Sequence, residues 1–245
     1  MTVKIEKPYT SLAKIYSYLM RSVDYKNWAK YLIDLFESFG FEQPRILELA
    51  SGTGKVSRFL EKKFNNIIYS DISLEMLKNF ETPERMLVCC DMTMLPFRTK
   101  FDIVFSIFDS VNYLTNTTQL KRMFNQVNKV LSDYGYFTFD VSLENNSKRY
   151  QKYLNRKGKF NGIHYKQISK YKEQTRIHYN IFELTFENGL TVQEIHKEKI
   201  YPLKVYYKLA ETEGLYVTAC YDAFSFNHGN DNSERVQLVL KKKDF

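Results

Sequence analysis

The chain has 245 residues, 44% of them hydrophobic, and a net charge of +8, which fits one large α/β domain with an insertion or two small domains. No apolar run approaches the roughly 18 residues that a membrane span needs, and residues 1–6 do not resemble a secretory signal. The three cysteines fall in predicted strands, so we expect reduced core thiols, no zinc site and a cytoplasmic protein.

The first strong pattern along the chain is a helix with one apolar face, in residues 28–39. Its apolar positions recur at helical spacing and are Trp28, Tyr31, Leu32, Leu35, Phe36 and Phe39. This face predicts an ordinary packed helix.

Residues 45–55 form an apolar strand with one acid, Glu48, followed by the turn Gly52-Thr53-Gly54 and a helix. Such a turn lets a ligand approach the backbone and aims free helix N–H groups at a negative group. A P-loop would need Gly and Ser or Thr where the chain has Leu49 and Val56. A dinucleotide fingerprint would need Gly or Ala where Ser57 stands, which weakens that reading without excluding it.

Three more apolar segments follow, at residues 67–71, 86–90 and 101–107, and an acid ends or soon follows each of them: Asp71, Asp91 and Asp109. The first acid comes about twenty residues after the glycine turn, where a Rossmann-like sheet places a carboxylate against ribose hydroxyls. Ser73 is predicted to cap the helix that carries Met76.

These pieces, in this register, resemble the class I S-adenosylmethionine (SAM)-dependent methyltransferases. The first motif of that family reads acid-x-small-x-Gly-x-Gly, and Glu48, Ala50, Gly52 and Gly54 fit it, with Ala50 in place of the usual first glycine. The resemblance implies that this turn faces the methionine carboxylate of SAM.

The resemblance also assigns roles to the later strand ends. It implies that Asp71 binds the ribose, that Ile72 lies against the adenine, and that Asp91 or Met92 meets the adenine as well. Residues 108–113 would border the reacting methyl group.

The rest of the core pattern alternates helices and strands, which predicts an open, mostly parallel sheet. An apolar helix covers residues 120–131, a fifth strand residues 135–141, and a short helix around 205–210 ends at Gly214. Strands at 215–226 and 234–241 close the chain. The resemblance implies a Rossmann-like seven-stranded sheet of class α/β, in which these last two strands form an antiparallel hairpin.

Residues 142–202 have a different pattern. Segments 175–186 and 190–201 alternate like strands around the turn Asn188-Gly189, and residues 162–171 offer a third strand. We therefore predict a core of residues 1–141 and 203–245 with an N-terminal helical cover, and an inserted antiparallel subdomain of residues 142–202. Similar small-molecule methyltransferases, including glycine and nucleotide-sugar N-methyltransferases, carry such an insert as a lid over the active site.

The N-terminal segment resembles a bacterial group in that same branch. Members read Tyr-x-x-Phe/Leu-Ala-x-x-Tyr-Asp-x-Leu-Met and then Asp-Tyr-x-x-Trp, and the chain matches from Tyr9 to Trp28 except at Ser17, where Asp is usual. The resemblance implies that this segment folds over the cofactor. The residues predicted to bind SAM are Tyr16, Trp28, Glu48, Ala50, Ser51, Gly52, Gly54, Asp71, Ile72, Met76, Asp91, Met92 and Phe108.

Positive charge is concentrated in residues 148–172, which hold nine Lys or Arg and no acid, more than the whole net charge of +8. Five aromatic residues are interleaved with them, a combination that attracts phosphates and stacks bases. A solvated lysine-rich face explains the same pattern. An anionic acceptor and RNA therefore both remain open as partners.

In-line transfer of a sulfonium methyl needs a nucleophile held close, and an amine acceptor must also lose a proton. Asp109, Asn112 and Tyr113 follow the fourth strand, at the sheet edge where α/β proteins bind ligands, and Asp109 and Tyr113 are the predicted catalytic residues. The four histidines are interpreted as solvated or packed side chains.

The sequence thus predicts a SAM-dependent methyltransferase acting on N or O of a small molecule. The alternatives are an RNA methyltransferase that uses the basic segment, and a SAM-binding regulator without catalysis.

Overall fold

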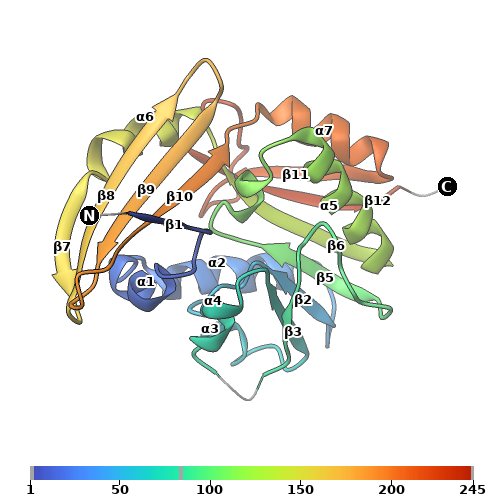
Figure 1. Cartoon of the computed structure of the whole chain (residues 1–245). Helices are drawn as coiled ribbons and strands as arrows, with labels where there is room; N and C mark the ends of the chain where they lie inside the picture. Colours follow the sequence, from blue (N-terminus) through green and yellow to red (C-terminus); the bar gives the residue numbers. More distant parts are fainter. Residues whose placement is uncertain (1–2, 83–84, 244–245) are drawn as a thin grey trace.

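The structure is a computed structural model that describes residues 3–82 and 85–243. Within these residues the chain forms a seven-stranded and a five-stranded sheet, which lie beside each other in Figure 1. In the described residues we find no helix that is long and apolar enough to cross a membrane.

The larger sheet has the strand order β11-β12-β6-β5-β2-β3-β4. Strands β2 to β6 run parallel, β12 is antiparallel to β6, and β11 is antiparallel to β12. Their bounds are β2 (Ile46–Leu49), β3 (Ile67–Asp71), β4 (Leu87–Cys89), β5 (Phe101–Ser106), β6 (Leu131–Ser142), β11 (Leu215–Asp222) and β12 (Arg235–Lys242). The predicted α/β sheet with a C-terminal antiparallel hairpin is confirmed.

Helices cover both faces of this sheet, so the central strand β5 is buried along almost its whole length. One face packs against α2 (Tyr25–Glu37), α3 (Ser57–Leu60) and α4 (Leu74–Lys78). The other packs against α5 (Thr117–Val130) and α7 (Leu203–Thr212). Ser73 caps α4 as predicted, because its side chain accepts a hydrogen bond from the Met76 N–H.

The smaller sheet, called the lid sheet below, has the order β1-β10-β9-β8-β7. Its strands are β1 (Lys4–Glu6), β7 (Arg156–Phe160), β8 (Ile163–Lys172), β9 (Ile177–Thr185) and β10 (Thr191–Lys199). The predicted hairpin and third strand are present. β7 is an addition, and so is β1, which the sequence analysis assigned to the cover of the core and which pairs in parallel with β10.

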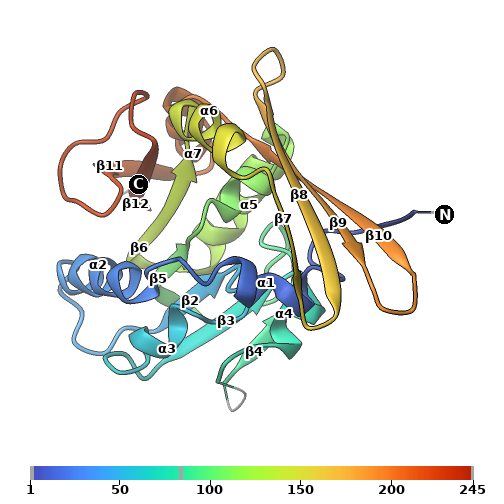
Figure 2. The same cartoon turned by 90° about the vertical axis from the view of Figure 1, so that its left-hand side faces the viewer.

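The lid sheet is covered on one face only, which explains the strict burial alternation of β8. The helix α1 (Ala13–Leu19) packs on the covered face through Leu12, Ile15 and Leu19, against residues such as Phe182 and Val192. The helix α6 (Glu144–Tyr153) lies along β8, as the turned view in Figure 2 shows.

The cysteine prediction needs correction. Cys220 is buried as expected, but Cys89 is exposed and Cys90 is half-buried. The strand β4 lies at the edge of the sheet, where one side has no neighbouring strand, so its side chains are less covered. All three thiols are free.

Candidate active site

A cavity of about 440 Å³ lies at the carboxyl ends of β2, β3, β4 and β5. The N-terminal segment closes one side with Tyr9 and Tyr16. The predicted SAM-binding residues that line this first cavity are Tyr16, Glu48, Ala50, Ser51, Gly52, Asp71, Ile72, Met76, Asp91, Met92 and Phe108.

The turn after β2 is built from left-handed backbone. Ala50, Gly52 and Gly54 have φ values of +55°, +60° and +70°, and a non-glycine residue such as Ala50 adopts this region at a cost. Gly54 does not line the first cavity. A Cβ atom at Gly54 would lie 2.4 Å from the ring of Phe80, so this glycine leaves room for the Phe80 side chain, which follows α4, to pack against the turn.

We therefore expect Gly54→Ala to reduce the free energy of unfolding by about 3 kcal/mol or more, since backbone strain and steric overlap add. Gly40→Ala is the matched control. Gly40 has a φ of +79° but no atom within 4 Å of its added Cβ, so only strain of about 1 kcal/mol is expected. Equal losses in urea denaturation would contradict the packing role of Gly54.

Asp71 joins two segments of the first cavity. One carboxylate oxygen accepts the Gly52 N–H at 2.8 Å, and the other accepts the Ser73 N–H at 2.7 Å. Burial raises the pKa of Asp71, and these backbone N–H groups oppose that rise. A carboxylate has about four acceptor sites, so ligand hydroxyls can bind to it as well.

Glu48 is buried in β2 at the floor of the cavity and accepts a hydrogen bond from Ser57 Oγ at 2.8 Å. Burial raises the pKa of Glu48 to about 8. In the ligand-free protein this side chain is therefore mostly protonated at neutral pH.

The raised pKa of Glu48 predicts a pH-dependent stability. The unfolded chain loses this proton near pH 4.5 and the folded chain near pH 8, so the ionisation destabilises the fold as pH rises between these values. In Glu48→Gln we expect this contribution, about 1.4 kcal/mol per pH unit at most, to vanish. Urea denaturation from pH 5 to pH 8 measures it, with the exposed Glu42→Gln as control; parallel profiles for wild type and Glu48→Gln would contradict the assignment.

Two buried hydroxyl oxygens in the turn, Ser51 Oγ and Thr53 Oγ1, have no hydrogen-bond partner within the described part of the chain. Both residues line the first cavity. Buried polar atoms are nearly always satisfied in proteins, so this cavity suits a ligand with its own polar groups. The unpaired hydroxyls, the Asp71 carboxylate and the open turn all fit a nucleoside linked to a charged amino-acid group.

A second cavity, of about 540 Å³, lies between the core and the lid sheet. Its wall includes Gln167, His178, Asn180, His196 and Glu198 from the lid sheet. Trp28, predicted to bind SAM, lines this second cavity and not the first.

Four side chains line both cavities, and all four are aromatic: Tyr9, Tyr16, Phe108 and Tyr113. They come from the N-terminal segment and from the residues after β5. A group that passes between the two cavities must therefore cross this aromatic boundary.

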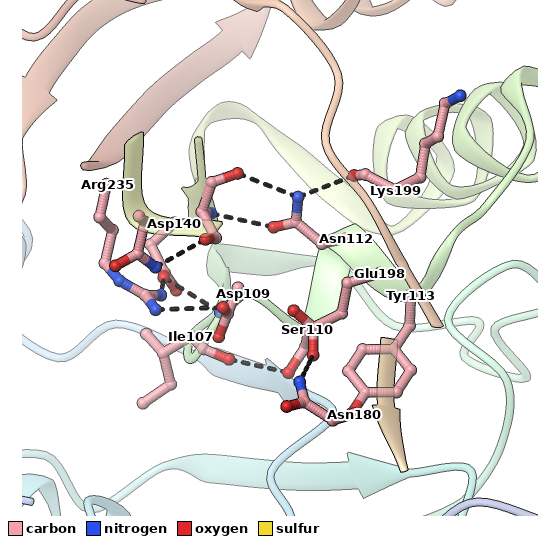
Figure 3. Close-up of polar contacts among 12 residues, drawn as sticks. Ile107, Asp109, Ser110, Asn112, Tyr113, Asp140, Asn180, Glu198, Lys199 and Arg235 are labelled. Atoms are coloured by element: carbon pink, nitrogen blue, oxygen red, sulfur yellow. Dashed lines mark hydrogen bonds and ion pairs between the residues drawn. The ribbon is translucent and has the colours of Figure 1, made fainter. Parts of the chain in front are cut away.

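The predicted catalytic residues Asp109 and Tyr113 both line the second cavity. Asp109 is ion-paired with Arg235 at 3.1 Å, and Arg235 also contacts the buried Asp140 (Figure 3). Asn112 is structural, because its side chain is bound to backbone groups of Ser142 and Lys199.

The second cavity also holds a partly buried acid, Glu198 of β10, which is not among the residues predicted from the sequence. Burial, with a smaller contribution from Asp109, raises the pKa of Glu198 to about 8, and Asn180 donates a hydrogen bond to it at 3.3 Å (Figure 3). Side chains alternate between the faces of a strand, so Glu194, His196 and Glu198 lie on one face of β10. This alternating row of polar residues is the sequence pattern that could have indicated Glu198.

The basic segment at 148–172 divides between two environments. Arg156 lines the second cavity, whereas Lys166, Lys170 and Lys172 lie on the uncovered face of β8. No group of three or more His, Cys, Asp or Glu suited to a metal ion occurs in residues 3–82 and 85–243.

Comparison with known proteins agrees with this geometry. Residues 46–135 match the family model described as a methyltransferase domain. The crystal structure of an S-adenosylmethionine-dependent methyltransferase from Clostridium acetobutylicum is 26% identical, with a TM-score of 0.79 over 96% of this chain and 99% of that one.

Two curated relatives match more locally. YqeM of Bacillus subtilis is 33% identical over 139 residues, which are 54% of this chain and 55% of that protein. The dTDP-3-amino-3,4,6-trideoxy-alpha-D-glucopyranose N,N-dimethyltransferase of Streptomyces venezuelae is 33% identical over 105 residues, 42% of this chain and 44% of that protein. The alignments thus span about half the length of these relatives.

Proposed function

We propose that the chain is a class I SAM-dependent methyltransferase and that it methylates a nitrogen or oxygen atom of a small molecule bound in the second cavity. The observation that carries this proposal is the aromatic boundary shared by the two cavities. It gives a cofactor and an acceptor one common contact surface.

The cofactor is SAM, and the first cavity would hold it. Asp71 would bind its ribose, Ile72 and Met92 would flank its adenine, and the turn at Gly52 would face its methionine carboxylate. When bound, SAM supplies a methyl group already activated by a positive sulfur.

The chain's own residues would mainly position the reactants and exclude water. Tyr9, Tyr16 and Phe108 line both cavities, so a methyl group moving from one cavity to the other would pass them, and Tyr9 and Tyr16 come from the N-terminal segment. Holding an acceptor in line at this boundary supplies much of the rate enhancement, since orientation alone is worth several kcal/mol.

An amine acceptor is favoured by the charges around the second cavity. The charged residues that line this cavity are three acids, Asp24, Asp109 and Glu198, and two arginines, Arg156 and Arg235. Arg235 is already paired with Asp109 and Asp140. A cationic amine beside Glu198 would favour the ionised carboxylate, whereas an anionic acceptor would meet the same group unfavourably. The amino-sugar dimethyltransferase among the relatives supports this direction.

Turnover of SAM tests the proposal. Purified protein is incubated with SAM and either the low-molecular-weight fraction of a bacterial extract or total RNA, and S-adenosylhomocysteine is measured. We expect product with the small-molecule fraction. Product with RNA alone would favour RNA methylation through the basic segment, and SAM binding without product in either case would favour a regulatory protein.

A further inference from the structure

Four side chains, two of them partly buried and two buried, form a continuous series of hydrogen bonds from the aromatic boundary into the lid sheet. Tyr9 and Tyr113 share a hydrogen bond of 2.7 Å between their hydroxyl oxygens. The Tyr113 hydroxyl lies 2.9 Å from Nδ1 of His196, and Nε2 of His196 lies 3.2 Å from the Glu194 carboxylate. Glu194 and His196 are almost completely buried.

The contacts of Glu194 fix the direction of these hydrogen bonds. Its two oxygens accept the backbone N–H groups of Tyr9, Ser11 and Leu12 at 2.6–2.7 Å. All three partners are donors, so both oxygens of Glu194 act as hydrogen-bond acceptors. Nε2 of His196 must therefore be the donor toward Glu194, and in neutral His196 the other nitrogen, Nδ1, is an acceptor.

It follows that Tyr113 donates its hydroxyl hydrogen to His196, and Tyr9 donates its own to Tyr113. The oxygen of Tyr9 then has unused acceptor capacity at the boundary between the two cavities. Each member of this series of hydrogen bonds has an atom that can accept a proton from the member before it. The carboxylate of Glu194 lies next to the last proton acceptor, His196.

Resting on the function proposed above, we infer that this series of hydrogen bonds takes up the proton that the acceptor loses during methylation, and that His196 holds the proton. As the new bond forms from the acceptor atom to the methyl carbon, the carbon–sulfur bond breaks and its electrons stay on sulfur. The acceptor's proton moves to Tyr9 or Tyr113, the hydroxyl protons shift along the chain, and Nδ1 of His196 becomes protonated beside Glu194.

The other candidate groups are less suited to this task. Burial holds the pKa of both Tyr9 and Tyr113 well above 10, so neither phenol retains a charge by itself and each only relays the proton. Asp109 is already ion-paired with Arg235.

The titratable groups that face His196 are Tyr9, Tyr113, Glu194, Glu198 and, on β9, His178.

The first test needs no acceptor. Nitrogen-15 NMR of histidine-labelled protein, with His196 assigned from the spectrum of His196→Asn, should show Nε2 protonated and Nδ1 unprotonated at neutral pH. The opposite tautomer would overturn the relay, because Tyr113 could then not pass a proton to Nδ1.

The second test measures turnover of SAM with the small-molecule fraction described above. In His196→Asn the amide can still accept a hydrogen bond from Tyr113 but cannot hold a proton. We expect kcat to fall by about 10²–10⁴-fold with unchanged calorimetric affinity for SAM, and to recover as pH rises. His164→Asn, on the exposed face of β8, is the control and should match wild type.

The outcomes separate this inference from the proposed function. Wild-type turnover in His196→Asn, with an unchanged pH profile, overturns the relay and leaves the methyltransferase proposal standing. Absence of turnover in the wild-type protein instead contradicts the proposed function.

Discussion

Replacing Asp71 with asparagine should weaken SAM binding by about 100-fold, the largest loss that we expect from a single change in the first cavity. The carboxylate holds the Gly52 and Ser73 N–H groups and is the predicted acceptor for ribose hydroxyls. An amide keeps one oxygen but points its NH₂ group at a partner that is itself a donor. Titration calorimetry with SAM measures the change.

The matched control is Asp34→Asn on the exposed side of α2, which carries the same change of charge away from both cavities. It should bind SAM like wild type. Equal affinity in Asp71→Asn and wild type would show that the ligand does not use this carboxylate.

Replacing Arg235 with methionine should lower the free energy of unfolding by about 3–5 kcal/mol. Arg235 lies between Asp109 and the fully buried Asp140, and its side chain is only 16% exposed. Removal of the guanidinium leaves a buried acid without its partner. Urea denaturation at neutral pH measures the loss.

The control for this change is Arg149→Met, which removes an ion pair with Glu234 whose side chains are 57% and 47% exposed. Exposed pairs contribute about 0–1 kcal/mol, so little change is expected. Adding Asp140→Asn to Arg235→Met should recover part of the stability, because the uncompensated charge disappears. No recovery would mean that lost packing, and not charge, causes the instability.

The core could be predicted from sequence because its signals are local. An apolar strand, a glycine turn and an acid at a fixed offset recur within short stretches, and the strand ends they predict meet at one sheet edge. The first cavity could therefore be predicted from residues such as Glu48, Gly52 and Asp71 without knowledge of distant contacts.

The second cavity could not be predicted in the same way, since its residues meet only through long-range packing. His196 contacts Tyr113 across 83 positions of sequence, and Asp140 contacts Arg235 across 95. The sequence favours a solvated or packed His196, because no sequence pattern links β10 to Tyr9.

The position of β1 shows the same limit. Three residues, Lys4–Glu6, carry too short a pattern to indicate a strand, and they extend because β10 offers an open edge. Trp28 likewise has the spacing of a packed helix residue, and only the tertiary structure brings it to the second cavity.

The central claim is that the two cavities are the two sides of one methyl transfer. A crystal structure with S-adenosylhomocysteine tests it most directly. We expect the nucleoside in the first cavity beside Asp71, and the sulfur among Tyr9, Tyr16, Phe108 and Tyr113, facing the second cavity. A sulfur turned away from that aromatic boundary, or a ligand bound elsewhere, would contradict the claim.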